Sequence, residues 1–161
     1  MSSKHPVPDK ASVLGMLGML FGDGLKVEPL NTPCDTDVDS NVVAVYVADD
    51  DAPSSACVCD ISFAAFAGAA LSMIPKGGAE DAAESGELSE IMLGNLHEVM
   101  NICSRLFMND SSPHLRLDAV HKNAGELPDA ARDMVAEPTA RSDFRVVIPG
   151  YGDGNLSFLS I

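Results

Sequence analysis

The segment ELSEIMLGNLHEVMNICSRLFM, residues 87–108, is the most informative part of this sequence. Its apolar residues recur at intervals of three or four, which places them on one side of an α-helix. They are Leu88, Met92, Leu96, Val99, Cys103 and Leu106. The segment that follows, NDSSP at 109–113, carries turn-forming residues and a proline. The spacing therefore predicts one long amphipathic helix over 87–108.

Segments on both sides of this helix are rich in β-branched residues or alternate apolar with polar residues, which is typical of strands. Strands are expected at 25–30, 41–49, 56–62, 114–121, 144–148 and 156–161, and further helices at 12–21 and 63–74. The polar segments 76–86 and 123–138 are expected to be loops, with a single helical turn at 130–135 in the second. Hairpins on both sides of a helical region predict an α+β fold, with a mainly antiparallel sheet and helices packed on one face.

The composition is that of a globular domain. The chain has 161 residues, of which 46% are hydrophobic and 21% charged. A chain of this length buries enough surface to fold without a metal or disulfides. We therefore expect a single domain over residues 1–161, with residues 1–9 as a flexible N-terminus.

The charge balance excludes one class of function and disfavours another. Acidic residues outnumber Lys and Arg by 24 to 10, which gives a net charge of −14. Nucleic-acid binding through phosphate neutralisation requires clustered cations, so it is excluded. Docking to anionic membrane surfaces is disfavoured, and the apolar runs 13–21 and 63–74 are shorter than the ~20 residues that cross a bilayer. The N-terminus has no pattern of a targeting signal, so we expect a cytoplasmic protein.

The four cysteines are expected to be thiols, as is usual in the cytoplasm. Cys57 and Cys59 lie two residues apart on an expected strand, so they face the same side and are expected to be core residues without a metal. Cys34 lies in a polar loop, and a reactive thiol is an alternative interpretation at this position. The pair HE at 97–98 begins like a zinc-binding helix, but Asn101 stands where that pattern has its second histidine. No metal or cofactor is expected.

The side of the long helix opposite its apolar stripe carries Gly94, Glu98, Asn101 and Arg105. Glu98 and Asn101 are three residues apart, so their side chains are neighbours on the helix surface. Taken alone, this side is open to two interpretations, an ordinary solvated face or a functional one.

The segment GNLHEVMNIC, residues 94–103, resembles the signature helix of the CheC/CheX/FliY family of response-regulator phosphatases. The family pattern has Asp or Ser, three residues, Glu, two residues and Asn, and Glu98 and Asn101 match it. The expected order of elements and the chain length are similar to those of a CheX-like member with a single such helix. Gly94 stands where the family has Asp or Ser, and Arg105 with Leu106 replaces a Gly-Asn pair that often follows the asparagine.

This resemblance implies a phosphatase that hydrolyses the aspartyl phosphate of a response-regulator receiver domain. Asn101 would position the attacking water, and Glu98 would pair with the receiver's lysine and orient the helix. Gly94 and Arg105 would be rim contacts with that partner. The protein needs no cofactor of its own, because any Mg²⁺ belongs to the receiver. The alternative is a non-catalytic CheC-like adaptor that docks a receiver or a motor component without hydrolysis.

The last expected strand also predicts an assembly. Residues 155–161 contain no proline and no charge that would blunt an exposed edge. An apolar edge of this kind pairs readily with another chain, and CheX-like proteins pair through their sheets. We therefore expect a homodimer.

Overall fold

The computed structural model describes residues 5–36 and 38–161. Its helices are α1 (Lys10–Phe21), α2 (Ile61–Ala70), α3 (Lys76–Ser85), α4 (Glu90–Cys103) and α5 (Asp129–Ala136), with the short 3-10 helices η1 (Ser104–Phe107) and η2 (Ala124–Glu126). Its strands are β1 (Lys26–Pro29), β2 (Val42–Val47), β3 (Pro53–Cys59), β4 (Arg116–His121), β5 (Ala140–Ile148) and β6 (Gly152–Ser160). Every strand expected from the sequence is present, with shifted boundaries.

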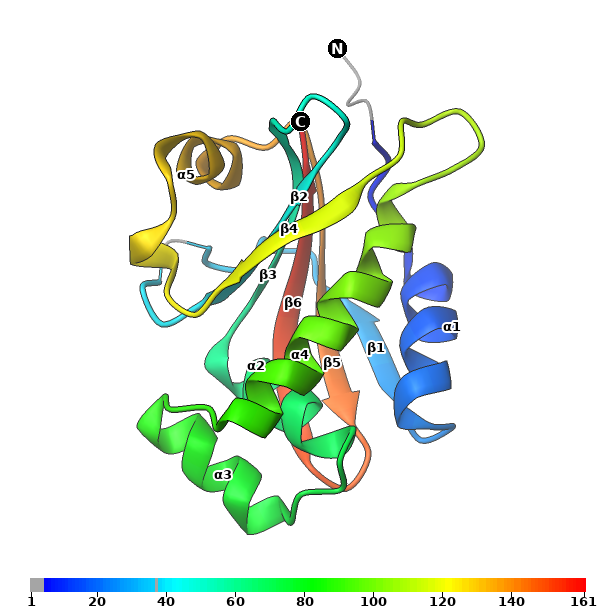
Figure 1. The fold of residues 1–161 in the computed structure, drawn as a ribbon. Coiled ribbons are helices and arrows are strands. Elements are labelled where there is room, and N and C mark those ends of the chain that lie inside the picture. Colours follow the sequence, from blue (N-terminus) through cyan, green and yellow to red (C-terminus); the bar gives the residue numbers. More distant parts are fainter. Residues whose placement is uncertain (1–4, 37) are drawn as a thin grey trace.

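The strands form one antiparallel sheet in the order β1-β5-β6-β3-β2-β4, which confirms the α+β class (Figure 1). The last strand, β6, lies between β5 and β3. The expectation that this strand forms an exposed edge is therefore wrong, because its backbone groups are paired within the chain on both sides. The edges of the sheet are β1 and β4. The homodimer remains a prediction, but the argument from an exposed edge at the last strand no longer supports it.

Helices cover both faces of the sheet. Every residue of β2 is buried, and alternate residues enter two different cores. One core lies beneath α2 and α4 and contains Val42, Ala44 and Tyr46; the other lies beneath α5 and contains Val43 and Val45. Figure 1 shows α5 on the side of the sheet opposite to α4. The expectation of helices on one face holds for α1, α2 and α4 but not for α5, since a strand that is apolar on both faces needs cover on both.

The segment 76–86 is helical, whereas a loop was expected. Helix α3 packs against α2 through alanines, Ala79 and Ala82, so the sequence shows no large apolar stripe there. Pro75 ends the preceding segment and begins α3 at its N-cap position, where its fixed φ angle suits a helix start. The other expected loop, 123–138, contains the whole of α5 rather than a single turn.

The segment before α1 is packed against the body of the protein. His5 and Pro8 are buried, and the His5 ring nitrogen Nε2 lies 3.1 Å from the carbonyl oxygen of Pro113. The Asp9 side chain accepts a hydrogen bond of 2.8 Å from the backbone N–H of Ser12 and so caps α1. Of the flexible terminus expected over 1–9, residues 1–4 lie outside the described residues, and residues 5–9 are held in place by these contacts.

The expectation that Cys57 and Cys59 are core residues is confirmed. Cys57, Cys59 and Cys103 are buried free thiols, and Cys34 is half-buried. Burial raises the pKa of the Cys57 and Cys59 thiols, which keeps them neutral. Within residues 5–36 and 38–161, no group of three or more His, Cys, Asp or Glu side chains is placed to hold a metal ion. Among the described residues, we find no helix that could span a lipid bilayer.

Candidate functional site

Helix α4 carries the residues that the sequence singled out. Ser89 begins it by accepting a hydrogen bond of 3.2 Å from the backbone N–H of Met92. The helix ends at Cys103 and tightens into η1, whereas one helix to residue 108 was expected. Its apolar side packs into the core through Met92, Leu96, Val99, Met100 and Cys103. This packing fixes which side of α4 faces solvent.

The exposed side of α4, which we call the open flank, consists of Gly94, Glu98, Asn101 and, on η1, Arg105. All of these residues are exposed, as expected from their helical spacing. Within the described part of the chain, the side chains of Glu98 and Asn101 have no hydrogen-bond partner, and Glu98 forms no ion pair. Both polar groups are therefore free to contact water or a partner.

Contacts in the core beneath α4 fix the position of the open flank. The buried Tyr46 hydroxyl donates a hydrogen bond of 2.5 Å to the carbonyl oxygen of Met100, the residue before Asn101. Burial raises the pKa of Tyr46 well above its usual value, so the phenol remains a donor. The Tyr46 ring also packs against Phe107 with the ring centres 5.2 Å apart. These contacts fix the backbone that carries Asn101 and Arg105.

A second set of contacts joins α4 to α2. The Asn95 amide donates hydrogen bonds of 2.8 Å to the Gly68 carbonyl oxygen and of 2.7 Å to Ser72 Oγ. At Gly68 the helices approach so closely that a Cβ atom would lie 2.7 Å from the Met92 carbonyl oxygen. The small residues of α2 thus allow close packing, and the position of α4 is set on this side as well.

Two pockets lie between α4 and the edge strand β4. One, of about 250 Å³, is lined by Asn101, Ile102, Ser104, Arg105, Met108, His114, Leu115 and Arg116. The other, of about 360 Å³, is lined by Leu93, Gly94, His97, Val120 and Lys122. The structure therefore places Asn101 and Arg105 at one pocket and Gly94 at the other, and Glu98 lines neither.

Sequence reasoning did not identify His114 and Arg116 as site residues. They enter the site because β4 pairs with β2 and places its start beside the end of α4. The only sequence signal is the alternation in HLRLDAVH, residues 114–121, which puts His114 and Arg116 on the same side of a strand. That signal does not say which helix the strand adjoins.

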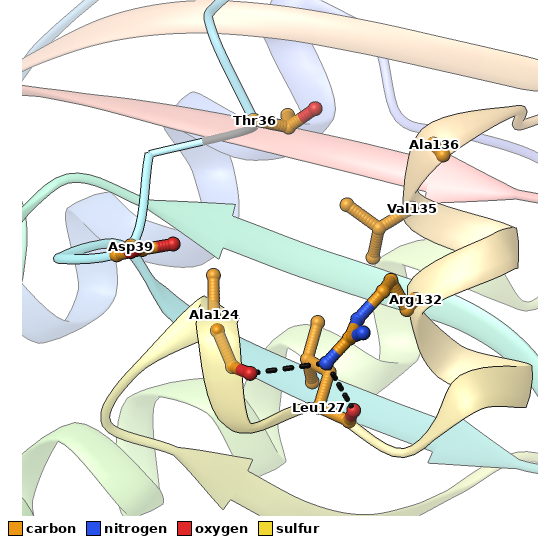
Figure 2. A pocket seen from close by; sticks show the side chains of 8 residues that line it. Thr36, Asp39, Ala124, Leu127, Arg132, Val135 and Ala136 are labelled. Atoms are coloured by element: carbon orange, nitrogen blue, oxygen red, sulfur yellow. Dashed lines mark hydrogen bonds between the residues drawn. The ribbon is translucent and has the colours of Figure 1, made fainter.

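A larger pocket, of about 630 Å³, lies on the opposite face of the sheet, between α5 and the side chains of Thr36 and Asp39 (Figure 2). Arg132, a charged residue that lines this pocket, already donates hydrogen bonds to backbone carbonyl groups of the protein. One guanidinium nitrogen of Arg132 donates to the carbonyl oxygens of Gly125, at 3.0 Å, and Leu127, at 3.2 Å. The arginine thus ties α5 to the turn before it, which gives this pocket a structural role.

The loop thiol Cys34 lies beside a partly buried ion pair. Asp143 accepts hydrogen bonds from Arg141, at 2.7 Å, from Ser157 Oγ, at 2.6 Å, and from the backbone N–H of Cys34, at 3.0 Å. Burial acts to raise the pKa of Asp143, but these hydrogen bonds outweigh it and the pKa is lowered. The pKa of the Cys34 thiol is raised, chiefly by burial, which disfavours the reactive thiolate. This cluster anchors the loop to the sheet.

The chain resembles solved structures of FliM and FliY over 94% of its length. FliM of H. pylori, in a FliM–SpeE complex, aligns with a TM-score of 0.63 and 12% identity over 80% of that chain. FliM in the H. pylori FliG–FliM complex gives 0.57 and 11% over 85% of that chain. FliY of Thermotoga maritima gives 0.58 and 15% over 83% of that chain. No protein-family model matches the chain, and no curated protein matches it significantly.

These likenesses establish the fold. The chain has the architecture shared by the FliM middle domain and FliY, and FliY is a named member of the family that the sequence resembles. The fold implied by the E-x-x-N helix is therefore confirmed. At such low identity a shared fold does not carry a shared activity, so function has to be argued from the open flank.

Proposed function

We propose that this protein hydrolyses the aspartyl phosphate of a response-regulator receiver domain, with the open flank of α4 as its working surface. The observation that carries the proposal is that the side chains of Glu98 and Asn101 are exposed and unpaired among the described residues. Both side chains are exposed one helical turn apart, and neither side chain takes part in a hydrogen bond among the described residues. The contacts behind α4 hold their backbone in place, which is what a preorganised site needs.

In this proposal Asn101 and Glu98 position the reactants and form no covalent bond. A water oxygen attacks phosphorus in line with the acyl oxygen, the bond between phosphorus and that oxygen breaks, and a carboxylate and inorganic phosphate are released. The Asn101 amide holds and orients the water, which lowers the barrier by positioning. Glu98 pairs with the receiver's lysine and fixes the register of the two proteins. Gly94 and Arg105 contact the partner at the rim.

The Mg²⁺ in this proposal belongs to the receiver, where it neutralises charge on the phosphoryl group. Asn101 and Glu98 act without a metal of their own. A receiver partner also implies a cytoplasmic location, which is part of the same proposal.

The proposal is tested by the decay of a phosphorylated receiver from the same organism. Wild-type protein should accelerate the decay. The Asn101→Ala variant should lose on the order of 10²-fold of that acceleration, by analogy with the loss of one oriented polar group at a reacting centre. The Asn31→Ala variant, which removes another exposed asparagine outside α4, is the matched control and should keep the wild-type rate. Wild-type rates in Asn101→Ala would refute the assigned role.

Glu98→Gln separates docking from chemistry. The loss of the carboxylate should raise the receiver concentration for half-maximal acceleration, while the maximal rate changes little. A large fall in the maximal rate with unchanged half-saturation would show that Glu98 acts on the reaction instead.

A second candidate function is a binding module without hydrolysis. It is favoured by the likeness to FliM, whose structures were solved in complexes with FliG and SpeE, and by Gly94, which offers no polar side chain where the family pattern has Asp or Ser. If wild-type protein binds a receiver but accelerates the decay of none, the binding module is the better assignment.

A further inference from the structure

The pocket beside Asn101 is basic, although the protein as a whole is strongly acidic. Arg105, His114 and Arg116 line it together, and no Asp or Glu is among its lining residues. The chain has only 10 Lys and Arg against 24 Asp and Glu. Two arginine side chains in a small pocket whose lining residues include no carboxylate favour the binding of anions there, although the protein as a whole is acidic.

Arg105 differs from the other arginines in the described part of the chain, because its guanidinium alone has no hydrogen bond or ion pair within that part. Arg132 donates to backbone carbonyls, Arg141 to Asp143 and Arg145 to Asp153. Arg116 pairs with Asp51, but both side chains are exposed, and an exposed pair of this kind is weak. The pocket thus holds one unpaired guanidinium and a second that is only loosely engaged.

The remaining polar groups of the pocket narrow the choice of ligand. The Ser104 hydroxyl donates a hydrogen bond of 2.7 Å to the Asn101 carbonyl oxygen, so its proton is already used. The available donors are then the Arg105 guanidinium, the exposed His114 and the Asn101 amide. Guanidinium groups bind the paired oxygens of phosphate in a bidentate fork.

We infer that the pocket lined by Asn101, Arg105, His114 and Arg116 is an oxyanion subsite that binds inorganic phosphate. The inference rests on the proposed function, because phosphate is the product released next to Asn101 in that reaction. The subsite would hold the phosphate oxygens as they leave the reacting centre. Its binding step requires no hydrolysis and can be measured alone.

The experiment is a titration of the isotope-labelled full chain with sodium phosphate at neutral pH, with sodium chloride used to keep the ionic strength constant. Amide shifts in nuclear magnetic resonance spectra should be saturable and concentrated at residues 101–108 and 114–116. Arg105→Gln should weaken phosphate affinity by about tenfold, since it removes a charge-assisted donor. Arg145→Gln removes the same charge from an exposed ion pair elsewhere and should change the affinity by less than about twofold.

Two results would overturn the inference: shifts that do not saturate, or equal weakening by Arg105→Gln and Arg145→Gln. Spectra that are unchanged away from the substituted residue verify that each variant is folded. Saturable phosphate binding in a protein that accelerates no receiver's decay would refute the proposed function and leave the subsite standing. Accelerated decay without phosphate binding would refute the subsite and leave the proposed function standing.

Discussion

The interface between α4 and α2 and the open flank of α4 each contain one glycine and one asparagine, in opposite situations. At the interface with α2, Asn95 bonds to Gly68 and Ser72, and Gly68 lies against the backbone of Met92. On the open flank, the Asn101 side chain has no hydrogen-bond partner among the described residues, and a Cβ atom at Gly94 would meet nothing within 4 Å. The difference shows that a glycine or asparagine on a helix is structural or available according to its contacts, and substitutions can test each assignment.

The largest stability effect in this comparison is expected for Gly68→Ala. The new Cβ atom would lie 2.7 Å from the Met92 carbonyl oxygen and 3.2 Å from its carbonyl carbon and Cα. These are backbone atoms that cannot rotate away, so α2 and α4 have to move apart. We expect the free energy of unfolding to fall by about 2 kcal/mol. Overpacking destabilises the protein, and the higher helix propensity of alanine offsets only part of that loss. Urea unfolding measures this change.

A wild-type urea midpoint in Gly68→Ala would contradict the close approach of the two helices. The companion substitution Ala67→Gly, at the preceding buried position of α2, removes volume instead of adding it. It should also destabilise the protein, by about 1 kcal/mol through backbone entropy. The two variants together separate steric overlap from helix propensity, because propensity alone predicts opposite signs for them.

Asn95→Ala is expected to have the next largest effect. It removes the donor to the Gly68 carbonyl, which lies in the last turn of α2 where carbonyl groups lack helical partners. We expect a loss of about 1 kcal/mol in the free energy of unfolding, because part of the hydrogen-bond contribution is offset by the better helix propensity of alanine.

Asn101→Ala is the matched control for Asn95→Ala in the same urea experiment. It makes the same chemical change on the same helix, but the side chain that it removes has no hydrogen-bond partner among the described residues, so the stability should be unchanged or slightly higher. Equal destabilisation by the two substitutions would mean that Asn101 also has a structural role.

The parts of the fold that follow from local patterns were predictable. The strands and α4 were expected because apolar periodicity reports local geometry. Helix α3 was missed because alanines supply its buried face, and alanine is not distinctive as a core residue. The central place of β6 was missed because its pairing with β3 joins residues that are about a hundred positions apart, and no local pattern encodes that partner.

The candidate site was predictable to the same extent. Helical spacing was enough to place Glu98 and Asn101 together on an exposed face. It could not show that Asn95, a residue of the same type six positions earlier, is used by α2, nor that His114 and Arg116 adjoin the end of α4. Those facts depend on how elements pack, which the spacing within one helix does not report.

Gly94→Ala is expected to have the smallest effect, and its sign is opposite to that of Gly68→Ala. The added methyl group meets no atom within 4 Å, so the steric cost seen at Gly68 is absent. Alanine also reduces the backbone freedom of the unfolded chain at an exposed helical position. The free energy of unfolding should therefore rise by about 0.5–1 kcal/mol, seen as a higher urea midpoint with an unchanged slope. If Gly94→Ala lowers the midpoint instead, the open flank is packed against another part of the chain. The assignments of the candidate site and of the phosphate subsite would then both be wrong.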